Sequence, residues 1–213
     1  MSRVSFRRVA RKSRVLAVKL RRNSARLRSN SEGVAAVEFG LLAPVLLVML
    51  LGTVEVSRAI SIDRKFGMVT STIADLVARE KTLTSTDVQA MYQIVDHLMK
   101  PWDSSTLKLS IIPVKASPTN KNDTRVYAAT TNRPTLNGAP IKSKCSTYTL
   151  ATDMLSTSTS VIVVETSYNF TPMFIGSIIG SSTWTDKSVL SPRNSCVDFD
   201  APSNCVSSCW PGG

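Results

Sequence analysis

One long run of apolar residues lies near the start of the 213-residue chain. Phe39 to Val54 are 16 residues without a charge, and leucine, valine and methionine dominate them. A helix of this length covers about 24 Å, and the mostly apolar residues 34–37 extend it to the thickness of a ~30 Å hydrocarbon core. Pro44 lies early in the run, where a membrane helix tolerates a kink. The pattern predicts a transmembrane helix over residues 34–57.

Helical periodicity continues beyond the apolar run. Apolar residues recur there at spacings of three and four, which predicts an amphipathic stalk whose apolar stripe packs on the rest of the protein. The stripe is predicted to contain Ile60, Phe66, Val69, Ile73, Leu76 and Val77. A Ser/Thr cluster at 84–86 then predicts the cap of a second helix, which Pro101 ends. Its apolar face is predicted to contain Val88, Met91, Tyr92, Val95, Leu98 and Met99.

The second half of the chain changes to a strand-like pattern. The segments 107–114 and 125–129 are predicted as strands, and 160–170, with Val, Ile and Tyr throughout, is the strongest of them. A further short strand is predicted at 182–190. Residues 130–147 are rich in Pro, Asn, Gly and Thr and predict a long loop. The tail, 191–213, is rich in Pro, Ser and Cys, and we expect disulfides rather than regular structure to hold it. The predicted fold class is α+β, a long N-terminal helix and a second helix followed by a small antiparallel sheet.

Positive charge is concentrated in an N-terminal arm. Residues 1–33 carry eleven Lys/Arg against one acid, a net charge of +10, which leaves +1 for the remaining 180 residues. A nearly neutral body excludes a folded basic face for nucleic acid, so we expect no nucleic-acid partner. The Arg/Ser-rich arm also resembles a mitochondrial presequence, but a long apolar run directly follows it, which argues against both interpretations. A single histidine, His97, excludes most histidine-dependent catalysis and His-rich metal sites.

The charge step predicts the orientation of the span. Eleven basic residues precede it and only Arg58, Arg64 and Lys65 follow it closely, so the positive-inside rule keeps the arm cytoplasmic and exports everything after about residue 57. All four cysteines lie in the exported part, where disulfides form. They are Cys145, Cys196, Cys205 and Cys209. Three pairings are open; at least one bridge is expected within the tail, and Cys145 is expected to tie the long loop to the tail. No histidine lies near the cysteines, so we expect no metal and no cofactor.

A carboxylate at the start of the apolar run is the most informative residue. Glu38 follows Gly33 by five positions, and a charge within the span costs roughly 2.5–3.5 kcal/mol even on the insertion scale. For an isolated glutamate, the simplest interpretation is an interfacial residue that reaches toward water. The surroundings favour a different interpretation, because a basic arm, Gly33, four small or β-branched residues, Glu38 and Phe39 precede the apolar run in that order.

This arrangement resembles the processing site of type IV prepilins, and most closely the TadE/TadG-like minor pseudopilins of tight-adherence (Tad/Flp) pilus systems. The segment GVAAVEFGLLAPVLLVMLLGTVEVSRA follows the TadE-like pattern through its early proline, late glycine and acidic residue before Arg-Ala. Near the C-terminus, VIVVETSYNFTPMF resembles the family's strand ending in Tyr-x-Phe-x-Pro. Ser191-Pro192-Arg193 stands where that family usually has Arg-Pro-Arg.

The resemblance implies a structural protein that is not an enzyme and that primes or supports pilus assembly. It implies cleavage by a prepilin peptidase between Gly33 and Val34, which removes the basic cytoplasmic leader, 1–33. Glu38 and Phe39 then occupy the positions associated with assembly, and Glu38 pairs with an α-amine in its own or a neighbouring pilin. The remaining parts are the span at 34–57, the helical stalk and second helix at 58–101, and a periplasmic β-rich domain at 102–213.

The competing hypothesis is a single-pass, membrane-anchored exported protein with an uncleaved signal anchor and a binding or structural role. It explains the span and the cysteines, but leaves the spacing of Gly33 and Glu38 as coincidence. Asp63, Asp75 and Glu80 are interpreted as a solvated face of the stalk rather than as an acid/base pair. The protein is expected in the bacterial inner membrane. Only the first hypothesis gives it pilin partners, and it leaves open whether the protein enters a surface pilus.

Overall fold

The structure is a computed structural model that describes residues 32–128, 135–174, 176, 180–199 and 209–210. It divides into two compact units, 1–54 and 55–213. We describe each unit by itself.

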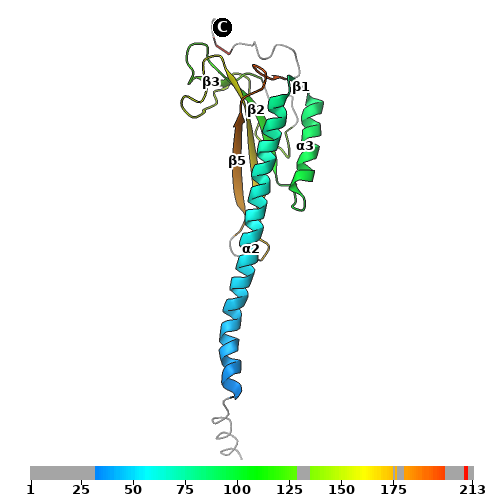
Figure 1. Cartoon of the computed structure of the whole chain (residues 1–213), viewed down its shortest axis with the longest axis vertical. Helices are drawn as coiled ribbons and strands as arrows, with labels where there is room; N and C mark the ends of the chain where they lie inside the picture. The colour runs from blue at the N-terminus through cyan, green and yellow to red at the C-terminus, as the bar shows by residue number, and fades with distance from the viewer. Residues whose placement is uncertain (1–31, 129–134, 175, 177–179, 200–208, 211–213) are drawn as a thin grey trace, which may run out of the picture. The chain divides into compact units, whose positions relative to one another are not determined.

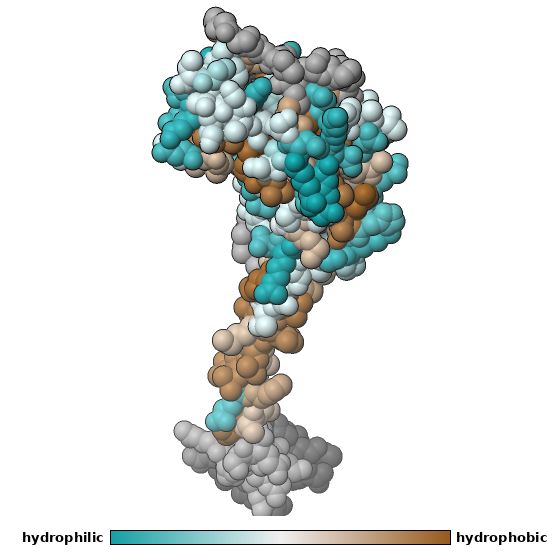
Figure 2. Space-filling model, turned by 45° about the horizontal axis from the view of Figure 1, so that its top comes forward, coloured by the Kyte–Doolittle hydropathy of each residue, from teal (hydrophilic) through white to brown (hydrophobic). Residues whose placement is uncertain are grey.

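The first unit consists, in its described part, of the N-terminal portion of one helix. Helix α2, Glu32–Arg79, is 48 residues long, contains Pro44 and continues into the second unit. Its large apolar side chains up to residue 54 are exposed. Figure 2 shows the brown, apolar surface on the side of the helix that faces the viewer. A helix that is apolar on every side and remains uncovered is typical of a membrane span. The helix is long and apolar enough to cross a membrane, as the sequence predicts.

The second unit combines two helices with a four-stranded antiparallel sheet of order β3-β2-β4-β5 (Figure 1). The elements are the second part of α2, α3 (Ser85–Met99), β2 (Lys108–Ala116), β3 (Thr124–Val126), β4 (Ser160–Phe170) and β5 (Ser182–Leu190). Strand β4 pairs with β2 from Ser160↔Lys115 to Ser167↔Lys108 and with β5 from Ile162↔Leu190 to Phe170↔Ser182. The α+β prediction is confirmed.

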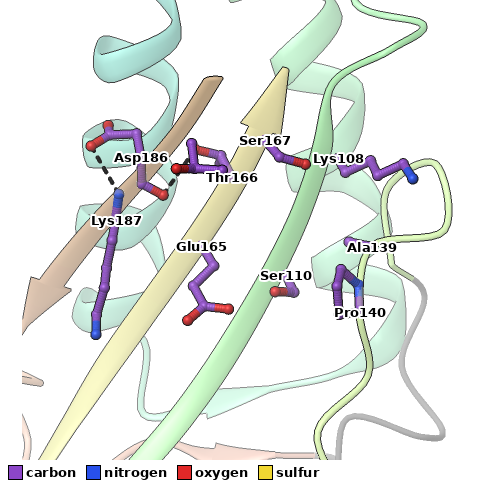
Figure 3. A pocket seen from close by; sticks show the side chains of 10 residues that line it. Lys108, Ser110, Ala139, Pro140, Glu165, Thr166, Ser167, Asp186 and Lys187 are labelled. Carbon is purple, nitrogen blue, oxygen red and sulfur yellow. Dashed lines mark hydrogen bonds between the residues drawn. The ribbon is translucent and has the colours of Figure 1, made fainter. Parts of the chain in front are cut away.

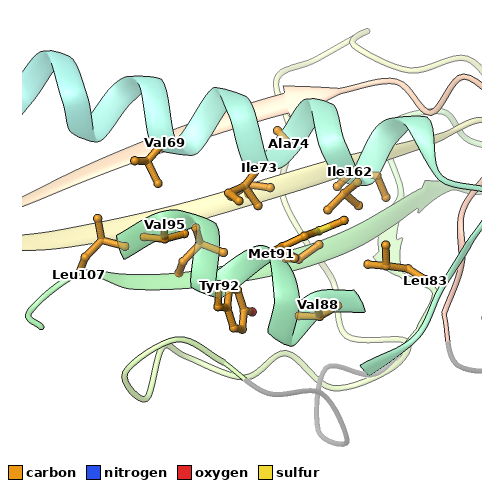
Figure 4. Packing of buried hydrophobic residues seen from close by; sticks show 14 of the residues in the cluster. Val69, Ile73, Ala74, Leu83, Val88, Met91, Tyr92, Val95, Leu107 and Ile162 are labelled. Atoms are coloured by element: carbon orange, nitrogen blue, oxygen red, sulfur yellow. The ribbon is translucent and has the colours of Figure 1, made fainter. Parts of the chain in front are cut away.

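The main core lies between the two helices and one face of the sheet (Figure 4). The predicted face of α3 is buried there, apart from Leu98, which is half-buried. The predicted stripe on α2 is correct except at its start, because Ile60 is exposed and Ile62 is buried instead. Ile60 lies six positions before Phe66, which turns its side chain away from the buried face of the helix. Ile62 lies four positions before Phe66, which places its side chain on that face.

Helix α3 begins where the Ser/Thr cluster predicts. Thr84 is its N-cap, and its hydroxyl accepts the Asp87 N–H at 3.2 Å while the Asp87 carboxylate accepts the Thr84 N–H at 2.9 Å. This reciprocal pair is a capping box, which satisfies two amide groups at the helix start. The Thr84 hydroxyl also donates to the Asp87 carboxylate at 2.7 Å, and this bond, together with that from the Thr84 N–H, lowers the pKa of Asp87 below its usual range.

Two expectations for the β-rich half need correction. The predicted strand at 125–129 ends at Val126; Tyr127 is buried beyond it, and Ala129 lies outside the described residues. The tail contains regular structure, since β6 (Asp198–Phe199) pairs in parallel with β1 (Thr82–Leu83) next to α3. Two-residue strands carry no periodicity, so the sequence pattern could not reveal them.

The opposite face of the sheet is covered by the segment that contains Cys145. Tyr148 and Leu155 pack there on a second cluster of buried side chains from β2, β3 and β4. A disulfide joins Cys145 to Cys209, which fixes this segment to the tail as expected. Trp210 beside it stacks over the Arg125 guanidinium, 5.5 Å from the ring centre. Cys196 is also disulfide-bonded.

The pairing of Cys145 with Cys209 predicts a specific cross-linked peptide. Non-reducing digestion and mass spectrometry should recover these two cysteines in one species. Cys145→Ser should lower the free energy of unfolding by about 4 kcal/mol, the chain-entropy estimate for the loop that Cys145 and Cys209 close. Cys205 lies outside the described residues, so its expected bridge to Cys196 remains a prediction. Cys196→Ser is the matched control and should leave the Cys145–Cys209 peptide intact; its loss in that variant would contradict the assignment.

Candidate processing and assembly site

The four residues singled out at the N-terminal end all lie in the first turns of α2. Gly33 and Val34 occupy its first turn, and Glu38 and Phe39 follow one turn later. Val34 and Glu38 are four residues apart, so they share one face of the helix. An amine created at Val34 would therefore lie one turn from the Glu38 carboxylate of the same chain. Acidic side chains close to a helix N-terminus are also favoured by the helix dipole.

The backbone at Gly33 is helical, whereas a protease binds its substrate in an extended form. Glycine is less favourable than alanine in a helix by about 1 kcal/mol, so the first turn unwinds more readily here. A Cβ built at Gly33 would meet no atom within 4 Å, and the same is true at Gly40. A side chain at either position is accommodated by the folded chain, which makes the two glycines a matched pair for testing processing.

Glu38 is exposed on the surface of α2 among apolar side chains such as Val37 and Phe39, which are also exposed. Among the described residues it has no ion-pair partner. An unpaired carboxylate in an apolar span is costly, and an opposite charge from elsewhere would offset that cost.

A second carboxylate, Glu55, comes directly after the uncharged run, and it is buried with 5% of its surface exposed. Its two oxygens accept the Met173 N–H at 3.0 and 3.1 Å, and one of them accepts the Phe174 N–H at 3.1 Å. Met173 and Phe174 begin the loop between β4 and β5. Glu55 thus fixes this loop to α2 across 118 residues of sequence.

Arg58 accompanies Glu55 one turn later on α2. Its Nη1 lies 3.6 Å from the Glu55 carboxylate, and its guanidinium lies over the rings of Trp102 and Phe170 at 5.5 and 6.0 Å. Phe170 in turn stacks on Trp184 with ring centres 4.5 Å apart. Cation–π contacts of this kind stabilise a guanidinium that is partly removed from water.

The motifs near the C-terminus contact the same helix. Tyr168 and Phe170, the aromatic pair of the Tyr-x-Phe-x-Pro segment, end β4 and belong to the core beside α2. The backbone N–H of Arg193, in the Ser-Pro-Arg segment, donates to the Ala78 carbonyl at 2.8 Å. The Arg193 guanidinium lies 3.7 Å from the Asp75 carboxylate. A hydrogen bond from Arg79, together with the charge of Arg193, lowers the pKa of the Asp75 carboxyl.

A polar cavity of about 540 Å³ lies on the sheet face that points away from the helices (Figure 3). Its walls include Lys108, Ser110, Glu165 and Lys187, from three neighbouring strands, and Pro140. Glu165 accepts a hydrogen bond from the Tyr148 hydroxyl, and burial together with this carboxylate raises the pKa of Tyr148. In the described part of the chain, no group of three or more His, Cys, Asp or Glu residues could bind a metal ion.

Part of the chain matches a known protein family. The model of the TadE-like protein family matches residues 33–75, which begin at Gly33 and extend through Glu38, Glu55 and Arg58. Residues 33–75 form a TadE-like segment. The resemblance seen in the sequence is thereby confirmed for this part of α2. The match does not extend to β4 or the tail, and no curated protein and no solved structure matches the chain.

The role of Glu55, which lies in the TadE-like segment, could not be predicted from the sequence. In the sequence it is only the acidic residue that precedes Arg-Ala in the TadE-like pattern. Its acceptor role is invisible in the sequence because its partners are backbone N–H groups in a distant loop. The available signal was its position, since a charge directly beside an apolar span needs either water or a partner.

Removing the Glu55 carboxylate should destabilise the second unit. Glu55→Ala leaves two backbone N–H groups without their charged acceptor, and we expect the free energy of unfolding in detergent to fall by about 2–4 kcal/mol. Asp63→Ala is the matched control, because Asp63 is an exposed acid on the same helix; it should change stability by less than about 0.5 kcal/mol. Equal effects of the two substitutions would contradict the role assigned to Glu55.

Proposed function

We propose that the chain is a TadE-like minor pseudopilin that supports assembly of a Tad/Flp pilus as a structural, non-enzymatic component. The observation that carries this proposal is the TadE-like match, which begins at Gly33, the residue after which cleavage is predicted. An apolar helix long enough to span a membrane directly follows that position. The proposed partners are a prepilin peptidase, the other pilins and pseudopilins of the system, and the inner membrane.

The first step of the proposed function is removal of residues 1–33. Their charge of +10 anchors the unprocessed chain to the cytoplasmic side, because moving so many charges through a bilayer is prohibitive. Cleavage between Gly33 and Val34 removes this anchor and creates a new α-amine at Val34. The β-rich domain, with its disulfides, lies in the periplasm in this proposal.

The second step is pairing between helices. Glu38 is exposed on α2, so its carboxylate is accessible to the amine of a neighbouring pilin as well as to that of its own chain. A pair formed in a low-dielectric bundle offsets the desolvation of both charges, whereas one charge alone does not. The glutamate would therefore favour the assembled form over the isolated helix in the membrane.

Processing is tested by matched glycine substitutions. In a host with an active prepilin peptidase, the wild-type protein should begin at Val34 by intact mass. Gly33→Leu should retain Met1, because a branched side chain blocks the close approach of the protease to the backbone. Gly40→Leu introduces the same side chain on the same open helix surface and should be cleaved normally. A wild-type protein that keeps Met1 would favour the uncleaved-anchor hypothesis instead.

Assembly is tested at Glu38. Glu38→Ala should still be cleaved and should stay in the membrane, since Gly33 and the apolar run are unchanged. Crosslinking to other pilins, and piliation, should fall strongly because the partner amine loses its counter-charge.

Glu38→Asp keeps the charge and should restore part of the crosslinking. Wild-type crosslinks and pili in cells that contain only Glu38→Ala protein at normal abundance would instead identify Glu38 as an interfacial residue without a role in assembly.

A further inference from the structure

The loop between β4 and β5 combines exposed apolar side chains with a fixed position beside α2. The exposed fractions of Met173 and Phe174 are 65% and 46%, and both residues are held by the Glu55 carboxylate through their backbone N–H groups. Residues 171–181, which connect the two strands, contain no charged side chain. Figure 1 shows the start of β5 and the end of this loop next to α2.

The position of Glu55 relates this loop to the membrane boundary. Residues 34–54 cover roughly 30 Å as a helix, which is the thickness of the hydrocarbon core. If α2 spans the bilayer, Glu55 is the first residue beyond the core on the exported side. A segment fixed to Glu55 then lies at the depth of the lipid headgroups and of the acyl-chain carbons next to them.

The aromatic residues around Glu55 agree with this depth. Trp102 lies against Arg58, and Trp184 stacks on Phe170, the last residue of β4. Both tryptophans are half-buried. Tryptophan is enriched at membrane interfaces, where an apolar ring and a polar N–H are both satisfied, and arginine extends its charge toward headgroups. Aromatic rings, a cation and exposed apolar side chains thus gather at one end of the sheet.

We infer that the β4–β5 loop is a second membrane contact, which inserts Met173 and Phe174 into the outer leaflet of the bilayer that α2 spans. The inference rests on the proposed membrane-spanning role of α2. The occupant of this apolar surface is lipid from the same membrane, because Glu55, which holds Met173 and Phe174, directly follows the apolar run in the sequence. Glu55 is then a positioning residue. It sets the depth of the loop and accepts two backbone N–H groups that would otherwise lack a partner in the interface.

Three exposed methionines provide a matched test. Met49 lies in the span, Met173 in the β4–β5 loop and Met154 in the loop near the start of β4, with exposed fractions of 66%, 65% and 47%. Strand β4 separates the last two loops by roughly 33 Å. Met49→Cys, Met173→Cys and Met154→Cys would each be spin-labelled in the full chain without reductant, so that the native disulfides stay unlabelled.

The labelled proteins would be reconstituted at low density into vesicles of phosphatidylethanolamine and phosphatidylglycerol. The accessibility of each label to oxygen, which partitions into lipid, and to a water-soluble nickel chelate is then measured. The ratio of oxygen to nickel accessibility should be several-fold higher at positions 49 and 173 than at position 154. Adding Glu55→Ala should lower the ratio at 173 and leave the ratio at 49 unchanged.

The other outcomes are distinguishable. A lipid-like label at 49 with a water-like label at 173 overturns the loop contact and leaves the membrane-spanning proposal intact. A label at 173 shielded from both reagents overturns it as well, because the side chain would then pack against protein rather than lipid. A water-like label at 49 overturns both proposals, because α2 would then not be in the bilayer.

Discussion

The hydrogen bonds from the β4–β5 loop to Glu55 link the helix that carries the TadE-like segment to the last strands of the sheet. The Glu55 carboxylate accepts two backbone N–H groups, and Arg58 beside it is covered by Trp102 and Phe170. A buried charge is tolerated only when it is paired or hydrogen-bonded, so these contacts are mutually dependent. They mark the position on α2 after which only one face of the helix is apolar and that face packs against the core.

Helix α2 meets two different requirements along its length. Up to residue 54 its apolar side chains are exposed on every side, which suits a lipid environment. From Ile62 to Val77 only one face is apolar and buried, which suits packing against α3 and the sheet. The family match covers both parts, since it runs from Gly33 to residue 75. The matched segment therefore contains both the apolar part of α2, which suits a lipid environment, and the part of α2 that packs against the folded domain.

Sequence pattern predicted the long elements well and the short or conditional ones poorly. Strand β4 has the predicted bounds because Val, Ile and Tyr residues recur along it, and β5 also has the predicted bounds. Thr84 caps α3 because its hydroxyl and Asp87 form a reciprocal pair. The β1–β6 pair is too short to leave a pattern. The pairing of Cys145 with Cys209 was open among three alternatives, because spacing along the chain does not determine which cysteines meet. The position of Glu55 gave a hint, but its partners are backbone groups with no signature.

The most direct test of the whole account is protease treatment of intact spheroplasts followed by mass spectrometry of the washed membranes. Cleavage from outside should remove the exported domain and leave a membrane-retained fragment that begins at Val34 and contains the apolar run Phe39–Val54. This single mass reports processing, the span and its orientation together. A retained fragment that begins at Met1, or a chain fully protected from external protease, would contradict the account.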